Sequence, residues 1–512
     1  MTAIPAVRPG TERLQAEGHS LSVALASFSF LTLGTVMGAA FHSGLYLEVV
    51  PGVITFWLLT IVAIRSCRLS RLSLLPRFLI VVYAFPFSAL LGYLFTPDFL
   101  WIFSPHGREI IADTIVVRQM ISVGTVGLCG LAAGIHAARF RPVAESPRAE
   151  MHKGAMNTLG FGVFVVLVAM AVGLSWLSTP AETIFQKAYM TDQEATAATR
   201  INFAAASLVS YILIVCLAID IEREIKVDAR RNKLLALGFG TAYIVIVFQV
   251  LRGDRESSGL IVALSALYLT STFRTSSHRA AMRAVRKRIM TMVVPLLVVI
   301  VVFITLGSAR YLIVAGTQTI GPLAMIQIGL AENTWTAVLW RNLGMAWEYR
   351  HGLLHFRLGE TYLEYLLSLP PGMVTNAFGI ARPFESWQGL SHEDPAGISV
   401  GGLHVVIAPF KNFGMAGALL ILSLYGWIAG RLEILNIRPS LMTRLLWASV
   451  MCCGFFWFWY GDMVFIRALM ASFLIYWLYR LALSAEWITR PIRPTGRATS
   501  RLSGRHDLRN QG

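Results

Sequence analysis

Charged residues are scarce in this chain, and their scarcity excludes most classes of water-soluble protein. Of its 512 residues only 14% are Asp, Glu, Lys or Arg, whereas 55% are hydrophobic. Soluble domains carry about 25% charged residues. The composition therefore excludes a soluble enzyme and a disordered chain, and it indicates a polytopic membrane protein.

Several motifs that carry chemistry in other proteins are also missing. None of the five cysteines falls in the long polar segment before Gly414, so no disulfide framework is expected. The phosphate-binding pattern G-x-x-x-x-G-K-[ST] does not occur, which argues against an ATP-driven pump. Neither H-E-x-x-H nor a Cys/His cluster indicates zinc, and we expect neither a metal nor another cofactor.

Long apolar runs dominate what is present. A hydrocarbon core of about 30 Å requires about 20 apolar residues per helix. Twelve runs come close to this length and predict an all-α polytopic membrane protein with about 12 transmembrane helices. These runs are 21–41, 45–64, 78–95, 118–137, 158–177, 204–221, 234–251, 259–273, 290–306, 415–430, 445–460 and 464–483.

The basic residues predict the orientation of these helices. If the runs alternate in direction, most of the 44 Lys and Arg lie on the side that bears the N-terminus. This asymmetry follows the positive-inside rule and places both termini in the cytoplasm. The net charge of +16 then reflects topology and contact with anionic lipid, and no nucleic acid is expected as a partner. The predicted regions are a cytoplasmic N-terminus, nine spans, a large extracytoplasmic loop, three spans and a disordered cytoplasmic tail: 1–20, 21–306, 307–414, 415–483 and 484–512.

The extracytoplasmic loop concentrates the polar chemistry. Loops of this length are usually functional or disordered, and this one is too apolar for disorder. We expect helices over 321–342 and 355–369, the second with Tyr362, Leu366 and Leu369 on one face and ended by Pro370-Pro371. The loop is compatible with an interfacial lid that has no chemistry, and equally with a polar cleft above an apolar layer. The polar residues of its second half are Arg382, Glu385, His392, Glu393, Asp394, His404 and Lys411.

A second polar concentration is the turn Arg252–Ser258 between the seventh and eighth runs. Arg252 and Arg255 flank a glycine at the predicted outer boundary, and arginine forks suit phosphate oxygens. A diphosphate clamp and a solvated turn are both open interpretations. Within the runs, Glu48 and Arg118 lie near outer ends, where charges are tolerated, while Arg467 could line a site.

Three segments resemble the Wzy-type oligosaccharide repeat-unit polymerases, which are relatives of the O-antigen ligases. One is G-x-R at Gly253-Asp254-Arg255, at the outer end of a mid-chain span. Another is the stretch Tyr362–Pro370, similar to the family's "YL..L...P" segment. The last is Asn412–Gly417, similar to its "nfG..G" element, although Ala408-Pro409 and Lys411 stand where the family often has an acid. The resemblance implies a GT-C-like membrane fold.

The resemblance also implies a function at the outer face of the bacterial inner membrane. Such enzymes polymerise undecaprenyl-diphosphate-linked oligosaccharide units into O-antigen or exopolysaccharide, and a chain-length regulator and a flippase are expected partners. An O-antigen-type ligase uses the same donor, and a secondary transporter with twelve helices is a third possibility, although no internal repeat is evident.

Two roles have candidate residues under this hypothesis. Arginines would stabilise the departing diphosphate, and a histidine or carboxylate would deprotonate the acceptor hydroxyl. The candidates for diphosphate binding are Arg252 and Arg255, then Arg382, Arg310 and Arg467. The candidates for the base are His392, Glu393, Asp394 and His404, with Glu360 as an alternative that is more suited to a structural pairing.

Overall fold

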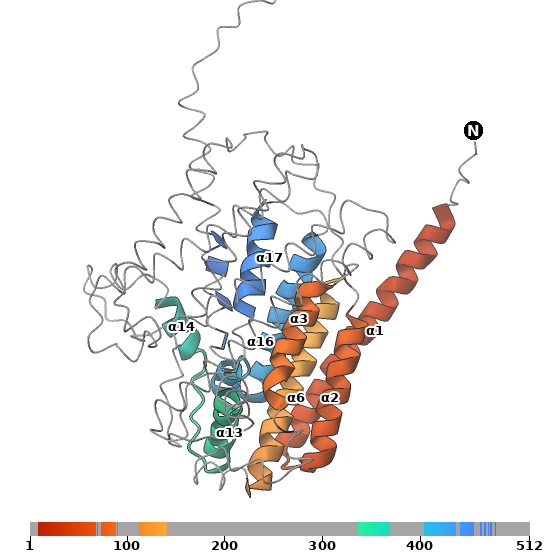
Figure 1. The fold of residues 1–512 in the computed structure, drawn as a ribbon. Helices are drawn as coiled ribbons and strands as arrows, with labels where there is room; N and C mark the ends of the chain where they lie inside the picture. The colour runs from red at the N-terminus through yellow and green to blue at the C-terminus, as the bar shows by residue number, and fades with distance from the viewer. Residues whose placement is uncertain are drawn as a thin grey trace, which may run out of the picture.

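The computed structural model describes about a third of the chain. The described residues are 9–67, 69, 73–88, 90, 112–140, 336–367, 404–436 and 441–454, with short pieces between 461 and 477. Every regular element in these ranges is a helix, and none of these residues forms a strand (Figure 1). This agrees with the predicted all-α class. The predicted spans between 158 and 306 lie outside the described residues.

Four of the described helices are long and apolar enough to cross a membrane. They are α1 (Pro9–His42, apolar from Ala24), α2 (Val49–Ser66), α6 (Thr114–Ala137) and α16 (Ile407–Leu435). These helices agree with the spans predicted at 21–41, 45–64, 118–137 and 415–430, with ends that differ by several residues. A helix that crosses lipid is apolar along its whole length, so hydropathy shows that a span is present. It shows less accurately at which residue the helix begins and ends.

Shorter helices complete the described part of the bundle. Helix α3 (Leu74–Ala84) continues into the 3-10 turn η1 (Phe85–Ser88), and α17 (Leu441–Gly454) follows α16. The run predicted at 78–95 therefore begins four residues earlier than expected. The α-helix gives way to η1 just before Pro86, which has no N–H to donate to a helical carbonyl.

Glycines bring α6 and α16 into direct contact along most of their length. A Cβ atom on Gly134 would lie 1.8 Å from the carbonyl oxygen of Ser423, and one on Gly130 would lie 2.3 Å from that of Leu419. Small residues at such an interface let two backbones approach closely, which favours helix association in a bilayer. Gly130 faces Leu419, and Gly134, four residues later in α6, faces Ser423, four residues later in α16. The two helices therefore run in the same direction, as the alternating topology predicts for the fourth and tenth spans.

The helix ends form two groups, which we call the Asp113 end and the Glu433 end. The Glu433 end brings together residues of five helices: Ser66 Oγ lies 3.0 Å from His136 Nε2, and the Glu433 carboxylate accepts from Leu74 N at 3.2 Å and Trp447 Nε1 at 2.9 Å. The Asp113 end holds the end of α1 and the starts of α2 and α6, at the bottom of Figure 1. This grouping agrees with alternating spans. That the Glu433 end faces the cytoplasm stays a prediction.

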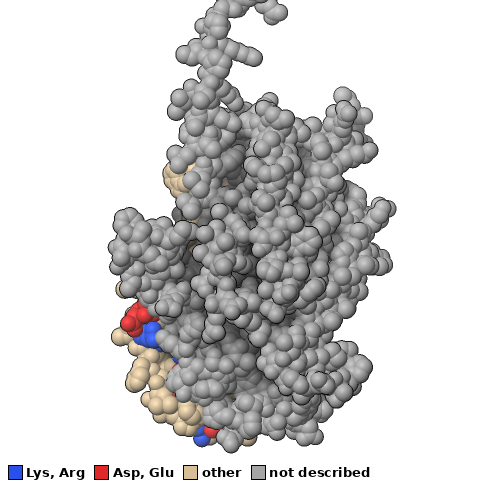
Figure 2. Space-filling model, turned by 60° about the vertical axis from the view of Figure 1, so that its left-hand side comes forward, with Lys and Arg blue, Asp and Glu red and all other residues tan. Residues whose placement is uncertain are grey.

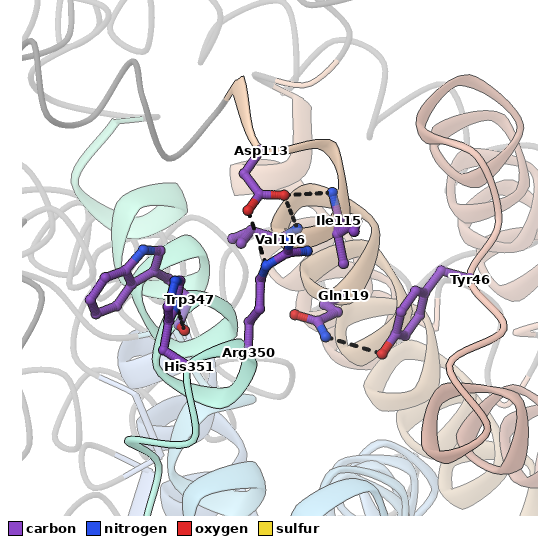
Figure 3. A network of polar contacts seen from close by, with 8 residues as sticks. All are labelled: Tyr46, Asp113, Ile115, Val116, Gln119, Trp347, Arg350 and His351. Atoms are coloured by element: carbon purple, nitrogen blue, oxygen red, sulfur yellow. Dashed lines mark hydrogen bonds and ion pairs between the residues drawn. The ribbon is translucent and has the colours of Figure 1, made fainter.

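Polar contacts at the Asp113 end attach helix α13 (Thr336–Arg350) to α6. Asp113 caps α6 by accepting from Ile115 N at 3.0 Å and Val116 N at 3.4 Å, and its other oxygen lies 3.1 Å from Arg350 Nε (Figure 3). An acid at a helix N-terminus is stabilised by the unpaired N–H groups and the helix dipole. Asp113 thus links two helices that lie more than 200 residues apart in the sequence.

Other charges near this end also neutralise one another. Arg118 and Glu48, which the sequence placed near outer ends of spans, form an ion pair between α6 and the start of α2. On the face shown in Figure 2, acidic and basic atoms of the described residues lie next to each other near the lower end. Pairing reduces the cost of charges close to the bilayer.

Two helix boundaries predicted for the long loop between 307 and 414 are wrong. The first loop helix was expected to end at 342, but α13 continues to Arg350 and is followed by Gly352 with φ 68°. The second was expected over 355–369, but α14 begins only at Glu360 and ends at Leu367. Leu358 (φ 49°) and Gly359 (φ 98°) are left-handed, which a continuous helix cannot accommodate.

Candidate functional site

The segment before α14 pairs with the start of α16. Arg357 N donates to the carbonyl oxygen of Lys411 and Leu358 N to that of Asn412, both at 3.1 Å. The Asn412 side chain adds a third bond, because its Oδ1 accepts from Gly359 N at 2.9 Å. Asn412 is fully buried, and its amide nitrogen donates to the carbonyl oxygen of Ala408 at 2.8 Å. These bonds satisfy backbone groups that have no partner within their own segment.

A buried ion pair fixes the same region to α13. Lys411 Nζ lies 3.1 Å from Glu348 Oε2, and the two side chains are only 10% and 6% exposed. Glu348 belongs to α13 and Lys411 to α16, so the pair joins two helices that lie about sixty residues apart in the sequence.

A break at Gly414 divides α16. Gly414 has φ 63° and ψ −147°, a conformation that is essentially restricted to glycine. The chain turns so tightly that a Cβ atom on Gly417 would lie 2.1 Å from the carbonyl oxygen of Pro409. The straight part of α16 therefore begins where the sequence predicted the span, at 415. Residues 407–413 form a separate helical piece inside the predicted loop.

Helix α14 packs against this break through its tyrosines. The ring of Tyr362 stacks on that of Phe413, with centroids 6.4 Å apart and planes 7° from parallel. Thr361 and Tyr365 are fully buried, whereas Leu366 is 54% exposed. That Tyr362, Leu366 and Leu369 share one face stays a prediction, because Leu369 lies outside the described residues.

The tyrosines of α14 reach a buried acid that follows α17. Asp462 has no exposed surface, and its Oδ2 accepts from the Tyr425 hydroxyl at 3.0 Å. The hydroxyls of Tyr362 and Tyr365 also lie close enough to influence this carboxyl. Burial is the main effect and raises the pKa of Asp462 to about 6, while the three hydroxyls lower it in part by stabilising the charged form. This acid–tyrosine cluster (Tyr362, Tyr365, Tyr425 and Asp462) is the candidate functional site.

The cluster unites elements from three parts of the chain. Its members come from α14, from α16 and from the turn before the last predicted span, and α13 and α14 lie on the same side of the bundle (Figure 1). A carboxyl with a pKa near neutral pH can exchange protons under working conditions. The tyrosine hydroxyls around it can form hydrogen bonds to a hydroxyl group of a ligand, or such a group can take the place of one of them. Among the described residues, no group of three or more His, Cys, Asp or Glu could hold a metal ion.

His404 is one of the four residues proposed first as the base, and it lies in the described part of the chain. Its ring is fully buried beside Tyr83 and Phe87, and its Nε2 lies 3.0 Å from the carbonyl oxygen of Tyr83. Burial lowers the pKa of His404 to about 4, and the bond to Tyr83 raises it only in part. The ring is therefore neutral at pH 7 and tethers the start of α16 to α3. Its catalytic role stays a prediction.

Of the remaining candidates, Glu360 is described and is the first residue of α14, the helix that carries Tyr362 and Tyr365. The others lie outside the described residues: Arg252, Arg255, Arg310, Arg382, His392, Glu393, Asp394 and Arg467.

Sequence reasoning missed Asp462, although a signal was present. It is one of few acids near the predicted spans 445–460 and 464–483, and ionisable residues in such positions are commonly functional. Its three-residue turn looked like an ordinary connection. Only the folded chain shows that the turn lies inside the bundle with the tyrosines around it.

Comparison of the chain with family models, with curated proteins and with solved structures finds no match. The fold class therefore stands on the described helices. The resemblance to repeat-unit polymerases stands on the residues that carry it.

Proposed function

We propose that this protein is a membrane glycosyltransferase that polymerises oligosaccharide units carried on a polyprenyl diphosphate, at the outer face of the bacterial inner membrane. One observation carries the proposal. The stretch from Tyr362 and the Asn412-Phe413-Gly414 element, two of the three segments that resemble the polymerases, pack against each other although about fifty residues separate them. Segments of a common site are expected to meet in this way.

The chemistry of the region suits such a substrate. The exposed side of α14 carries Leu363, Leu366 and Leu367, which are 58%, 54% and 49% exposed, while its inner side carries the tyrosines. An apolar face beside a polar interior fits a ligand with a lipid end and a sugar end. The lipid diphosphate is itself a good leaving group, so the transfer requires neither a nucleotide nor another cofactor.

Arginines are assigned to the diphosphate under this proposal. Arg252 and Arg255 are the first choice, with Arg382, Arg310 and Arg467 after them. A guanidinium keeps its charge at every working pH and stabilises the negative charge that develops on the departing group. A chain-length regulator and a flippase are the expected protein partners, and the termini are expected in the cytoplasm.

One observation favours a second candidate function. A fully buried carboxyl between helices, such as Asp462, also occurs in the proton relays of secondary transporters. A transporter would use the cluster to bind and release a proton during transport. An O-antigen-type ligase is the third candidate, since it uses the same donor.

Deletion of the gene separates these functions. A strain without a polymerase is expected to accumulate lipid carriers that bear single oligosaccharide units and to lose long surface polysaccharide. A strain without a ligase would accumulate long lipid-linked polymer. Unchanged lipid-linked glycans and unchanged surface polysaccharide would refute both transferase functions and leave the transporter.

A further inference from the structure

Asp462 differs from the other buried acids of the described part in having no strong partner. Glu348 is paired with Lys411, and Glu433 accepts from two backbone N–H groups and from the Trp447 indole. Among the described residues Asp462 pairs with no Lys or Arg, and its Oδ1 makes no hydrogen bond. Its Oδ2 accepts from a neutral hydroxyl, that of Tyr425, and the hydroxyls of Tyr362 and Tyr365 lie close enough to influence it.

Such an arrangement is costly if it serves stability alone. Placing a carboxyl in a dry interior disfavours folding unless its oxygens are hydrogen-bonded, and native structures rarely leave one unbonded. Asparagine or a hydrophobic residue would fill the same space without this cost. The buried carboxyl and its unbonded oxygen therefore point to a ligand group that completes the site.

We propose that Asp462 is the proton acceptor for the acceptor sugar, with Oδ1 as the atom that receives the proton. This inference rests on the proposed function. Tyr425 is a positioning residue that donates to Oδ2, and the Tyr362 and Tyr365 hydroxyls mark where a sugar hydroxyl fits. The ligand that this site binds is the hydroxyl-bearing end of a lipid-linked oligosaccharide.

The step balances with these groups alone. The O–H bond of the acceptor hydroxyl breaks and its proton moves to Asp462 Oδ1. The oxygen forms a bond to the anomeric carbon of the donor chain, whose bond to the diphosphate oxygen breaks, and the electron pair leaves with the lipid diphosphate. The carboxyl releases its proton afterwards, and a pKa near neutral pH suits both halves of this cycle.

Helix α14 carries the part-exposed member of the cluster: Tyr362 is half-buried, and the adjacent Leu363 is 58% exposed. Under this proposal the Tyr362 side chain moves aside, and the incoming hydroxyl takes the position beside Asp462 that the Tyr362 hydroxyl occupies.

The test uses the full-length protein in lipid nanodiscs and lipid-linked oligosaccharide extracted from the deletion strain. Polymer formation is measured between pH 5 and pH 9 for the wild type and for Asp462→Asn, which keeps the shape and the Tyr425 bond. We expect the wild-type rate to fall as the pH drops through about 6, because the acid form cannot accept a proton. We expect Asp462→Asn to lose about 10²–10⁴-fold in rate, the range of general base catalysis.

A second variant keeps the inference testable if Asp462→Asn fails to fold. Tyr425→Phe removes a hydrogen bond that favours the charged carboxyl, so the acidic limb of the pH profile should move about one unit higher. Tyr46→Phe is the matched control: its hydroxyl accepts from Gln119 Nε2 at 3.0 Å at the Asp113 end, and its loss should leave the limb in place.

The outcomes separate the inference from the proposed function. A wild-type protein that makes no polymer from the extract overturns both. An active wild type with Asp462→Asn within threefold of it overturns the inference and leaves the function standing. If Asp462→Asn is unfolded, the test rests on the acidic limb of the pH–rate profile. An unchanged limb in Tyr425→Phe overturns the inference, and a limb that moves in Tyr425→Phe but not in Tyr46→Phe supports it.

Discussion

The ion pair between Glu348 and Lys411 allows a quantitative prediction about the stability of the candidate site. Replacing Glu348 by Gln preserves the size of the side chain but leaves the Lys411 ammonium without its counter-ion. Both groups are almost fully buried, at 6% and 10% exposure, and their charged atoms lie 3.1 Å apart. Solvent therefore cannot replace the lost carboxylate.

The expected cost follows from this geometry. At an effective dielectric constant of about 20, the attraction between unit charges at this distance is about 5 kcal/mol. Removing one partner of a buried pair typically costs about 3–5 kcal/mol, because the other charge stays buried without compensation. We expect Glu348→Gln to lower the free energy of unfolding by an amount in this range. Glu48→Gln is the matched control: the Glu48 side chain is 67% exposed, so its loss should cost about 1 kcal/mol or less.

The assay is unfolding of the purified protein in mixed micelles by a denaturing detergent, followed by tryptophan fluorescence. The variant Lys411→Met should cost a similar amount to Glu348→Gln, and the double variant should cost less than either one, because no unpaired charge remains. Equal losses from Glu348→Gln and Glu48→Gln, or single costs that simply add in the double variant, would refute the reasoning.

Three further predictions concern other parts of the molecule. Gly134→Ala should lower the free energy of unfolding by about 1–3 kcal/mol, because its Cβ would overlap α16; Gly38→Ala, whose Cβ finds ordinary contact at 3.5 Å, should be neutral or stabilising in the same unfolding assay. Gly414→Ala should cost about 1–3 kcal/mol through its left-handed backbone, and a neutral result would show that the break is not required. Arg255→Ala should abolish polymer in cells while immunoblots still find the protein in the membrane; normal long-chain polysaccharide would remove Arg255 from the site.

The spans could be predicted because each depends on its own residues. A helix in lipid satisfies all of its backbone groups internally, so an apolar run of sufficient length is enough to specify it. This is why α2 and α6 lie within a few residues of the predicted positions. The ends were less accurate, since caps such as Asp113 form with residues that hydropathy does not reveal.

The loop helices were harder to predict for the same kind of reason. The periodicity of 355–369 suggested one helix, yet its first residues instead form backbone bonds to Lys411 and Asn412. Those partners lie more than fifty residues away in the sequence, so no local pattern predicts these bonds. The role of Asp462 was hidden likewise, because a carboxyl acquires its properties from the groups that surround it.

Composition and hydropathy alone determined that this chain belongs in a bilayer, that it is helical and where several of its helices run. These properties follow from the local balance between apolar side chains, backbone hydrogen bonds and lipid. Only the tertiary structure decided that an acid from α13 pairs with Lys411, that α14 packs on the Gly414 break and that Asp462 is enclosed by tyrosines. Burial and electrostatic interactions depend on distances in space. The local sequence of two distant segments does not show how close they lie in the folded protein.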